Sequence, residues 1–165
     1  MLGGMKRWGV VGILLLAFLG LADSVYLAQH AVNGTPLLCN INFLSGCNTV
    51  AASPYAYLFG IPLAEFGVLF YSILFVLAAL ELALFNQVLR RALQVTAAVG
   101  LFFSLYFTSL QMFVIEAFCI YCVISALITI FVVILASFIE PVWRRKNGNS
   151  PIITPPPRLS MPPRP

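Results

Sequence analysis

The segment from Ala92 to Ile139 is predominantly apolar and contains one charged residue, Glu116. As a single helix it would be roughly 70 Å long at about 1.5 Å per residue, more than twice the roughly 30 Å hydrocarbon core of a membrane. The segment must therefore fold back on itself, and the turn belongs near Glu116. Two further apolar runs precede it, so the sequence predicts four transmembrane helices at about residues 8–28, 61–85, 92–116 and 118–139.

The composition agrees with a membrane protein. Of the 165 residues, 61% are hydrophobic and 8% are charged, whereas about a quarter of the residues of a soluble domain are charged. We therefore expect an all-α fold, an integral membrane four-helix bundle in contact with membrane lipid. A cleaved signal peptide is a less favoured alternative, because the apolar run over residues 8–28 is longer than the usual signal core of about 7–15 residues.

The basic residues predict the orientation of the helices. Seven of the nine lie in three short clusters between the apolar runs, namely Lys6 and Arg7, Arg90 and Arg91, and Arg144, Arg145 and Lys146. All three clusters fall on one side of a four-helix bundle, so the positive-inside rule places both termini in the cytoplasm. Charges arranged in this way form no nucleic-acid-binding face. We expect the transmembrane domain at residues 1–146 and a disordered, proline-rich cytoplasmic tail at residues 147–165.

All four cysteines then fall on the opposite, outer side of the membrane. Cys39 and Cys47 lie in a long outer loop at residues 29–60, and Cys119 and Cys122 open the fourth helix as a C-x-x-C pair. Free N–H groups and the helix dipole stabilise a thiolate on the first cysteine of such a pair. Cys119 is therefore the expected attacking thiol on the aqueous side, whereas Cys122 is expected to point toward the bundle interior.

Two cysteine pairs on one face favour a disulfide relay. Two static disulfides and a four-cysteine zinc site are the alternatives, and haem attachment is disfavoured because Val123 follows Cys122. A relay needs an electron acceptor, and the sequence contains no dinucleotide or haem motif. A lipid-soluble quinone is the acceptor that a membrane bundle could hold without one. Aromatic residues of the third and fourth helices could line its pocket, namely Phe102, Phe103, Tyr106, Phe107, Phe113, Phe118 and Tyr121.

Two further features concern the outer side. Ser53-Pro54 is a helix-start signal, so we expect a short helix that ends at Gly60 and rests its aromatic residues on the membrane interface.

Three acidic residues at the outer ends of the helices could pass protons to a reduced quinone, namely Asp23, Glu65 and Glu116.

Several of these motifs together resemble the vitamin K epoxide reductase family over roughly residues 8–140. They are Cys39 and Cys47, Ser53, the helix entry Gly60-Ile61-Pro62-Leu63-Ala64-Glu65-Phe66-Gly67, and Phe118-Cys119-Ile120-Tyr121-Cys122. The resemblance implies a four-helix bundle around a quinone, with Cys119 and Cys122 as the active-site pair. It also implies that Cys39 and Cys47 shuttle electrons and that Ser53 belongs to the functional loop. We expect the quinone to contact Cys122, Phe118, Tyr121 and Phe66.

Two departures from the family pattern indicate which branch applies. The asparagine and tyrosine that hydrogen-bond the quinone in the vertebrate enzyme would fall at Leu63 and Ala126, which cannot form those bonds. The resemblance therefore favours the bacterial type, which oxidises a separate thioredoxin-fold partner and reduces ubiquinone or menaquinone in the bacterial inner membrane. No fused thioredoxin domain is expected. A vertebrate-type vitamin K epoxide or quinone reductase and a non-enzymatic tetraspanning protein with structural disulfides are the alternatives.

Overall fold

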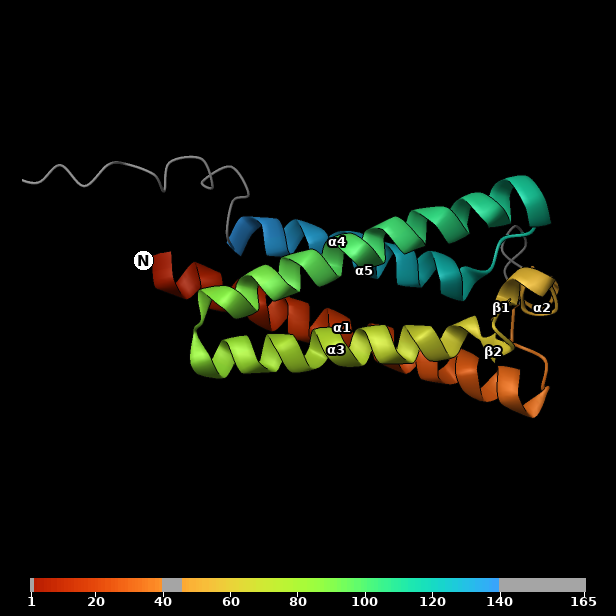
Figure 1. Cartoon of the computed structure of the whole chain (residues 1–165), viewed down its shortest axis with the longest axis horizontal. Helices are drawn as coiled ribbons and strands as arrows, with labels where there is room; N and C mark the ends of the chain where they lie inside the picture. The colour runs from red at the N-terminus through yellow and green to blue at the C-terminus, as the bar shows by residue number, and fades with distance from the viewer. Residues whose placement is uncertain (1, 40–45, 140–165) are drawn as a thin grey trace, which may run out of the picture.

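The computed structural model describes residues 2–39 and 46–139. Four long helices lie side by side along its long axis (Figure 1), namely α1 (Leu2–Asn33), α3 (Leu63–Leu84), α4 (Gln87–Leu110) and α5 (Ile120–Ile139). The connection from α1 to α3 carries the short helix α2 (Cys47–Ala51), a 3-10 turn (Pro54–Ala56) and two strands, β1 (Tyr57–Leu58) and β2 (Ile61–Pro62). A π-helical turn (Gln111–Ile115) ends α4.

Four segments are long and apolar enough to cross a membrane, namely Arg7–Asn33, Leu63–Leu84, Gln87–Ile115 and Ile120–Ile139. The expected all-α, four-helix membrane bundle is thereby confirmed, and the chain is a multi-pass membrane protein. Most boundaries differ from the prediction by one to six residues. The first helix continues to Asn33 because nothing interrupts it before Gly34, whose φ is +63°. The third begins at Gln87 because the Asn86 side chain accepts a hydrogen bond from the Val88 N–H at 3.0 Å. The predicted tail lies outside the described residues.

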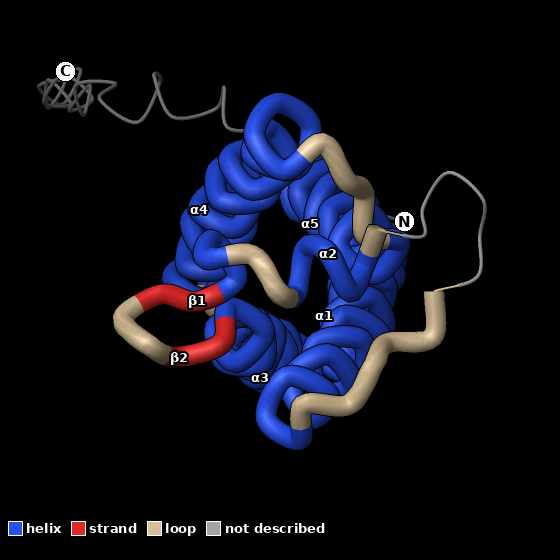
Figure 2. Tube along the Cα trace, turned by 90° about the vertical axis from the view of Figure 1, so that its right-hand side faces the viewer, coloured by secondary structure: helices blue, strands red, loops and turns tan. Residues whose placement is uncertain are grey.

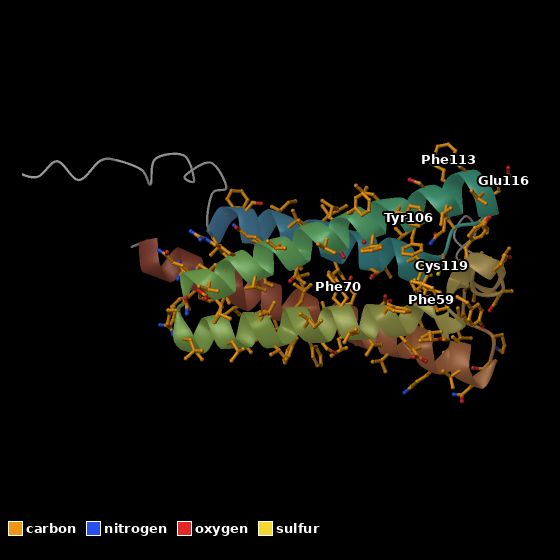
Figure 3. All side chains as sticks on the ribbon, in the orientation of Figure 1. Phe59, Phe70, Tyr106, Phe113, Glu116 and Cys119 are labelled. Carbon is orange, nitrogen blue, oxygen red and sulfur yellow. A yellow bond between two sulfur atoms is a disulfide. The ribbon has the colours of Figure 1, made fainter. Side chains whose placement is uncertain are left out.

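The core of the bundle is built by small residues and branched aliphatic ones. α1 packs against both α3 and α5, and α4 packs against α5. Gly20 of α1 lies against the ring of Tyr71, and Gly100 of α4 lies against Phe70, so a Cβ at either glycine would collide with the ring. Figure 3 shows Phe70 between α3 and α4. Close approach at small residues is how transmembrane helices associate, since lipid provides no hydrophobic driving force.

A buried ion pair fixes the turn from α3 to α4. Glu81 is 1% exposed, and its carboxylate accepts hydrogen bonds from the Arg90 guanidinium and from the Asn86 N–H. The Arg7 guanidinium of α1 lies 5.4 Å from the centre of the Phe85 ring in the same turn. Two of the basic clusters therefore lie at one end of the bundle, as the topology prediction requires.

The opposite end, which we call the cysteine end, carries α2 and the β-hairpin. Figure 2 shows α2 lying across this end and the hairpin at its periphery. The predicted short helix from Ser53 to Gly60 is wrong, because only Pro54–Ala56 form a single 3-10 turn. Phe59 (φ 54°) and Gly60 (φ 81°) both have left-handed backbones, which close a two-residue hairpin turn. The strands pair as Tyr57 with Pro62 and Leu58 with Ile61.

Candidate redox site

All four cysteines gather at the cysteine end. Cys47, Cys119 and Leu37 form a buried cluster, and Cys39 and Cys122 pack against it. Cys47 is fully buried and Cys119 is 2% exposed, whereas Cys39 and Cys122 are half-buried. Figure 3 places Cys119 at the end of the bundle that also carries Phe59 and Glu116. The fold thus brings together residues that are about 80 positions apart in the sequence.

The loop pair is oxidised. Cys39 and Cys47 form a disulfide, with their Cα atoms 6.2 Å apart. The side chain of Asn48, the residue after Cys47, holds the segment that leads to Cys39. Its Oδ1 accepts from the Leu37 N–H at 2.8 Å, and its Nδ2 donates to the Leu37 carbonyl at 3.3 Å. The amide therefore restrains both arms of the disulfide, using an acceptor and a donor that aspartate could not both provide.

A glycine brings the loop against the C-x-x-C segment. The Gly46 N–H donates to the Phe118 carbonyl at 3.1 Å. A Cβ at Gly46 would lie 2.8 Å from the Ala117 Cβ and 3.0 Å from both the N and O atoms of Phe118. Only glycine permits this approach, since backbone atoms cannot rotate out of the way. The contact places Cys47 and Cys119, the next residues on each side, in one cluster.

The second pair is reduced, as free thiols. A hydrogen bond with the Cys122 thiol is the main cause that lowers the pKa of Cys119 from 9.0 to about 7. The backbone N–H groups of Cys122 and Tyr121 act in the same direction, while burial and the charge of Asp23 oppose them. The direction of this shift is the one expected for the first cysteine of the pair, but its main cause is the Cys122 thiol and not the free N–H groups of the helix start. The prediction that Cys119 faces water is wrong, because the loop covers it.

Tyr121 connects the two pairs. Its hydroxyl donates to the Leu38 carbonyl at 2.9 Å, and its ring centre lies 5.1 Å from that of Tyr26 on α1. Leu38 directly precedes Cys39, and Tyr121 directly precedes Cys122. Tyr121 therefore fastens the loop to α5.

The remaining residues that were predicted to contact the quinone differ in how far they are exposed. Phe118 is half-buried in the turn before Cys119, and Phe66 on α3 is 37% exposed. The proposed pocket walls Phe102, Phe103, Tyr106 and Phe113 are each more than half exposed, and Phe113 points away from the bundle in Figure 3. These four side chains fit a lipid-facing surface better than a pocket wall.

Ser53 holds the end of α2. Its hydroxyl donates to the Val50 carbonyl at 2.7 Å, in place of the expected helix cap. The side chain thereby fastens the chain at the point where it leaves α2 for the 3-10 turn.

Gln111 also lies at this site, although it is not among the predicted site residues. This residue is 5% exposed, and its Oε1 accepts from the Cys119 N–H at 3.4 Å. A signal existed, since Gln94 and Gln111 are the two amides in the apolar segment 92–139, and polar groups inside membranes are costly.

A polar network also lies below Cys122. The Tyr71 hydroxyl donates to the Ser125 carbonyl at 2.9 Å and lies 3.1 Å from the Thr129 Oγ1. Ser125 is three residues beyond Cys122, about one helical turn further into the bundle. Polar groups of α3 and α5 are therefore hydrogen-bonded to one another on the side of Cys122 that lies deeper in the bundle.

The cysteine end has features that fit a quinone. A quinone needs a largely apolar site with a few groups that can exchange hydrogen bonds or protons with its two carbonyl oxygens. Among the described residues, the Asp23 Oδ2 is buried and has no hydrogen-bond partner, and Asp23 is close enough to act electrostatically on Cys119. Glu65 and Glu116 are exposed. Asp23 is therefore the acidic residue that is placed to meet a bound group.

The fold and the site define a membrane protein whose chemistry is centred on two cysteine pairs. The sequence model described as the Vitamin K epoxide reductase family matches residues 11–137, which is most of the chain. The chain belongs to the vitamin K epoxide reductase family. The family relationship makes it an oxidoreductase, of a kind linked to quinones. No individual curated protein gave a significant match to this sequence.

Proposed function

We propose that this protein is a membrane thiol:quinone oxidoreductase. It oxidises a separate thioredoxin-fold protein and reduces ubiquinone or menaquinone, and so supports disulfide formation in secreted proteins. The observation that carries the proposal is the gathering of an oxidised pair and a reduced pair in one buried cluster. Static disulfides would not leave two thiols beside a disulfide that they can attack.

The relay begins at Cys39. Because Cys39 is the less buried sulfur of the loop pair, a thiolate of the partner attacks it, and the Cys39–Cys47 bond breaks with its electron pair on Cys47. Cys47 then attacks Cys119 in a Cys119–Cys122 disulfide, and Cys122 leaves as a thiolate. Exchange of this kind proceeds through mixed disulfides.

The second half of the exchange restores the loop pair. The partner's second thiol attacks its own sulfur in the bond to Cys39 and leaves the partner oxidised. Cys39 then attacks Cys47, which re-forms the loop disulfide and frees Cys119. In this scheme the described state, with the loop pair oxidised and Cys119 and Cys122 as thiols, is the one in which electrons have reached the inner pair.

The final step re-forms the Cys119–Cys122 disulfide. A bound quinone supplies the two-electron acceptor and takes up two protons. Cys122 would be the sulfur that faces the quinone, Phe118, Tyr121 and Phe66 would contact it, and Asp23 would hold a proton at its otherwise unpaired Oδ2. Tyr121 also keeps the loop closed over the pair through Leu38, which excludes water from the thiols.

The orientation follows from the charges. We place the ends that carry Arg7 and Arg90 in the cytoplasm and the cysteine end outside, in a bacterial inner membrane, with residues 1–146 as the functional domain. This arrangement exposes the loop to an oxidising compartment, where disulfides persist.

The test is a coupled assay on the full chain in lipid vesicles that contain a defined quinone. Adding a reduced thioredoxin-fold protein should consume one quinone per pair of partner thiols. Cys122→Ala should abolish the reaction, whereas Ser137→Ala, a matched change near the other end of α5, should leave it intact. Partner oxidation without quinone consumption, or a Cys122→Ala protein that works normally, would overturn the proposal.

A further inference from the structure

The tip of the β-hairpin exposes a large apolar side chain at a strained position. Phe59 is 93% exposed, and its φ of 54° lies in the left-handed region. Bulky residues rarely adopt such a backbone, and two-residue hairpin turns favour asparagine, aspartate or glycine at this place. Phenylalanine therefore conflicts both with the chemistry of the turn and with exposure to water. Conflicts of this kind are expected at functional sites.

The tip extends away from the rest of the protein. Figure 2 shows the hairpin at the side of the bundle, beyond the outlines of α3 and α4. A Cβ at Gly60 would meet no atom within 4 Å apart from its two neighbours in the chain. The hairpin is attached through β2, which packs against α1 and α3. It therefore points sideways from the bundle axis, which is the direction in which lipid surrounds a membrane protein.

The length of α3 indicates the depth of the hairpin in the membrane. α3 has 22 residues, so at about 1.5 Å per residue it is roughly 33 Å long, close to the roughly 30 Å thickness of the hydrocarbon core. The helix begins at Leu63, directly after Pro62 of β2. The hairpin thus lies at the level where the hydrocarbon ends and the lipid headgroups begin.

The surface around the tip matches this boundary. Three more apolar or aromatic side chains of the hairpin are between 42% and 45% exposed, namely Tyr57, Leu58 and Ile61. Aromatic rings are enriched where a membrane meets water. The sequence contains no Asp, Glu, Lys or Arg from residue 31 to residue 64, so the hairpin has no charge with which to attract a charged partner. The chain then passes directly into α3, where Leu69 and Ile73 lie exposed one turn apart.

We propose that the hairpin is a membrane anchor, which places the Phe59 ring between the headgroups and the acyl chains of the leaflet at the cysteine end. Insertion of the ring removes apolar surface from water and so offsets the strain of its backbone. The 3-10 turn Pro54–Ala56 joins the hairpin to Ser53 and α2, so the anchor also holds the loop of Cys47 at the membrane surface. This role does not depend on the proposed redox function.

The first test measures the depth of position 59 in the full chain. The two natural tryptophans, Trp8 and Trp143, are replaced by phenylalanine, and Phe59→Trp then introduces the sole tryptophan. Phosphatidylcholine vesicles carry bromine, which quenches tryptophan fluorescence on contact, either near the headgroup or near the middle of the bilayer. Thr49→Trp is the matched control, because Thr49 is exposed on α2, which lies across the end of the bundle (Figure 2).

The shallow bromine should quench the Phe59→Trp protein about twofold or more, and the deep bromine should quench it less, because an interfacial ring lies only about 5–10 Å inside the boundary. The Thr49→Trp protein should be quenched by neither, since α2 faces water. Equal quenching of the two proteins, or stronger quenching of Phe59→Trp by the deep bromine, would refute the anchor.

A second test separates lipid binding from the chemistry of the turn. Asparagine suits a left-handed turn better than phenylalanine does, so in a hairpin that faces water Phe59→Asn should slow amide hydrogen exchange of the two strands or leave it unchanged. If the ring anchors the hairpin in lipid, Phe59→Asn should instead speed this exchange about tenfold in vesicles, because most of the apolar burial is lost. Phe59→Leu keeps an apolar side chain and is the matched control.

Slower or unchanged exchange in Phe59→Asn would contradict the proposal. So would hairpin amides that become protected only when a reduced thioredoxin-fold protein is added, because this result assigns the surface to that partner.

Discussion

Replacing Gly46 with alanine should separate the two halves of the relay. The added Cβ would lie 2.8 Å from the Ala117 Cβ, whereas carbon atoms pack at about 3.5–4.0 Å. The turn before Cys47 must therefore move by roughly 0.7 Å or more. Two of the three atoms it meets belong to the backbone of Phe118, so side-chain rotation cannot relieve the contact.

The size of the effect follows from this displacement. Overpacking typically lowers the free energy of unfolding by about 1–3 kcal/mol. About 1 kcal/mol of this loss would come from the weakened hydrogen bond between the Gly46 N–H and the Phe118 carbonyl. A misplacement of about 1 Å can slow a reaction about a hundredfold. We therefore expect the attack of Cys47 on Cys119 to slow by about ten- to a hundredfold, since each 1.4 kcal/mol is a factor of ten.

The assay compares two electron sources in the same vesicles. A reduced thioredoxin-fold partner must send its electrons through Cys47, whereas a small membrane-permeant dithiol can reduce Cys119–Cys122 directly. Gly46→Ala should lose most of the first rate and retain the second within about twofold. Gly12→Ala is the matched control, because its Cβ meets the end of a flexible side chain, the Leu135 Cδ1, at 3.0 Å.

Two outcomes would contradict this reasoning. If Gly46→Ala retains the full partner-driven rate, the close approach at Phe118 does not set the geometry of the exchange. If both rates fall together, the glycine supports the whole fold, and the loop and the bundle are not separable units.

Three further predictions concern the cysteines. Cys39→Ser should block oxidation of the partner but leave reduction of quinone by the small dithiol largely intact, and equal loss of both activities would argue against a division of labour. Cys119→Ala should give a visible charge-transfer band with added quinone, since Cys122 remains as the thiolate donor, and a band found only in Cys122→Ala would reverse the two roles. In the reduced protein, alkylation of Cys119 should be half-maximal near pH 7 rather than pH 9.0. Because its pKa is lowered, the thiolate should persist down to pH 7 and decline tenfold per pH unit below it, and this half-point should rise in Cys122→Ala, where the main stabilising hydrogen bond is lost.

The helices could be predicted because their signals are local. The length and apolar character of a transmembrane span follow from bilayer thickness, so one segment with a lone Glu116 was enough to indicate two helices and a turn. The cysteines could be assigned to one end for the same reason, since their positions relative to the spans follow from the topology. The resemblance adds the proposed roles of the two cysteine pairs.

The remaining features depend on contacts that no local pattern contains. Ser53-Pro54 correctly marks the start of a helical turn. The turn ends early because the chain enters a hairpin, which requires a left-handed backbone at Phe59, a residue that is not glycine. Cys119 was expected in water because it begins a helix, and only the fold of the loop over it reverses that expectation. Gln111 was missed because its partner is the N–H of Cys119, which lies 8 positions further along the chain.

The contacts between loop and bundle also specify which sulfurs meet. Gly46 bonds Phe118, and these residues directly precede Cys47 and Cys119. Tyr121 bonds Leu38, and these directly precede Cys122 and Cys39.

Each of these two hydrogen bonds therefore brings the residue before a loop cysteine against the residue before an inner cysteine. The hydrogen bond from the Gly46 N–H to the Phe118 carbonyl holds the two main chains closer together than the bond from Tyr121 to Leu38 does, because no side chain lies between them. Cys47 is accordingly held against Cys119, while Cys39 is set apart by the length of a tyrosine side chain and stays half-buried. In the proposed relay this difference favours Cys47 for the exchange with the inner pair and Cys39 for the exchange with the partner, while the reduction potentials of the two pairs set the direction in which electrons flow.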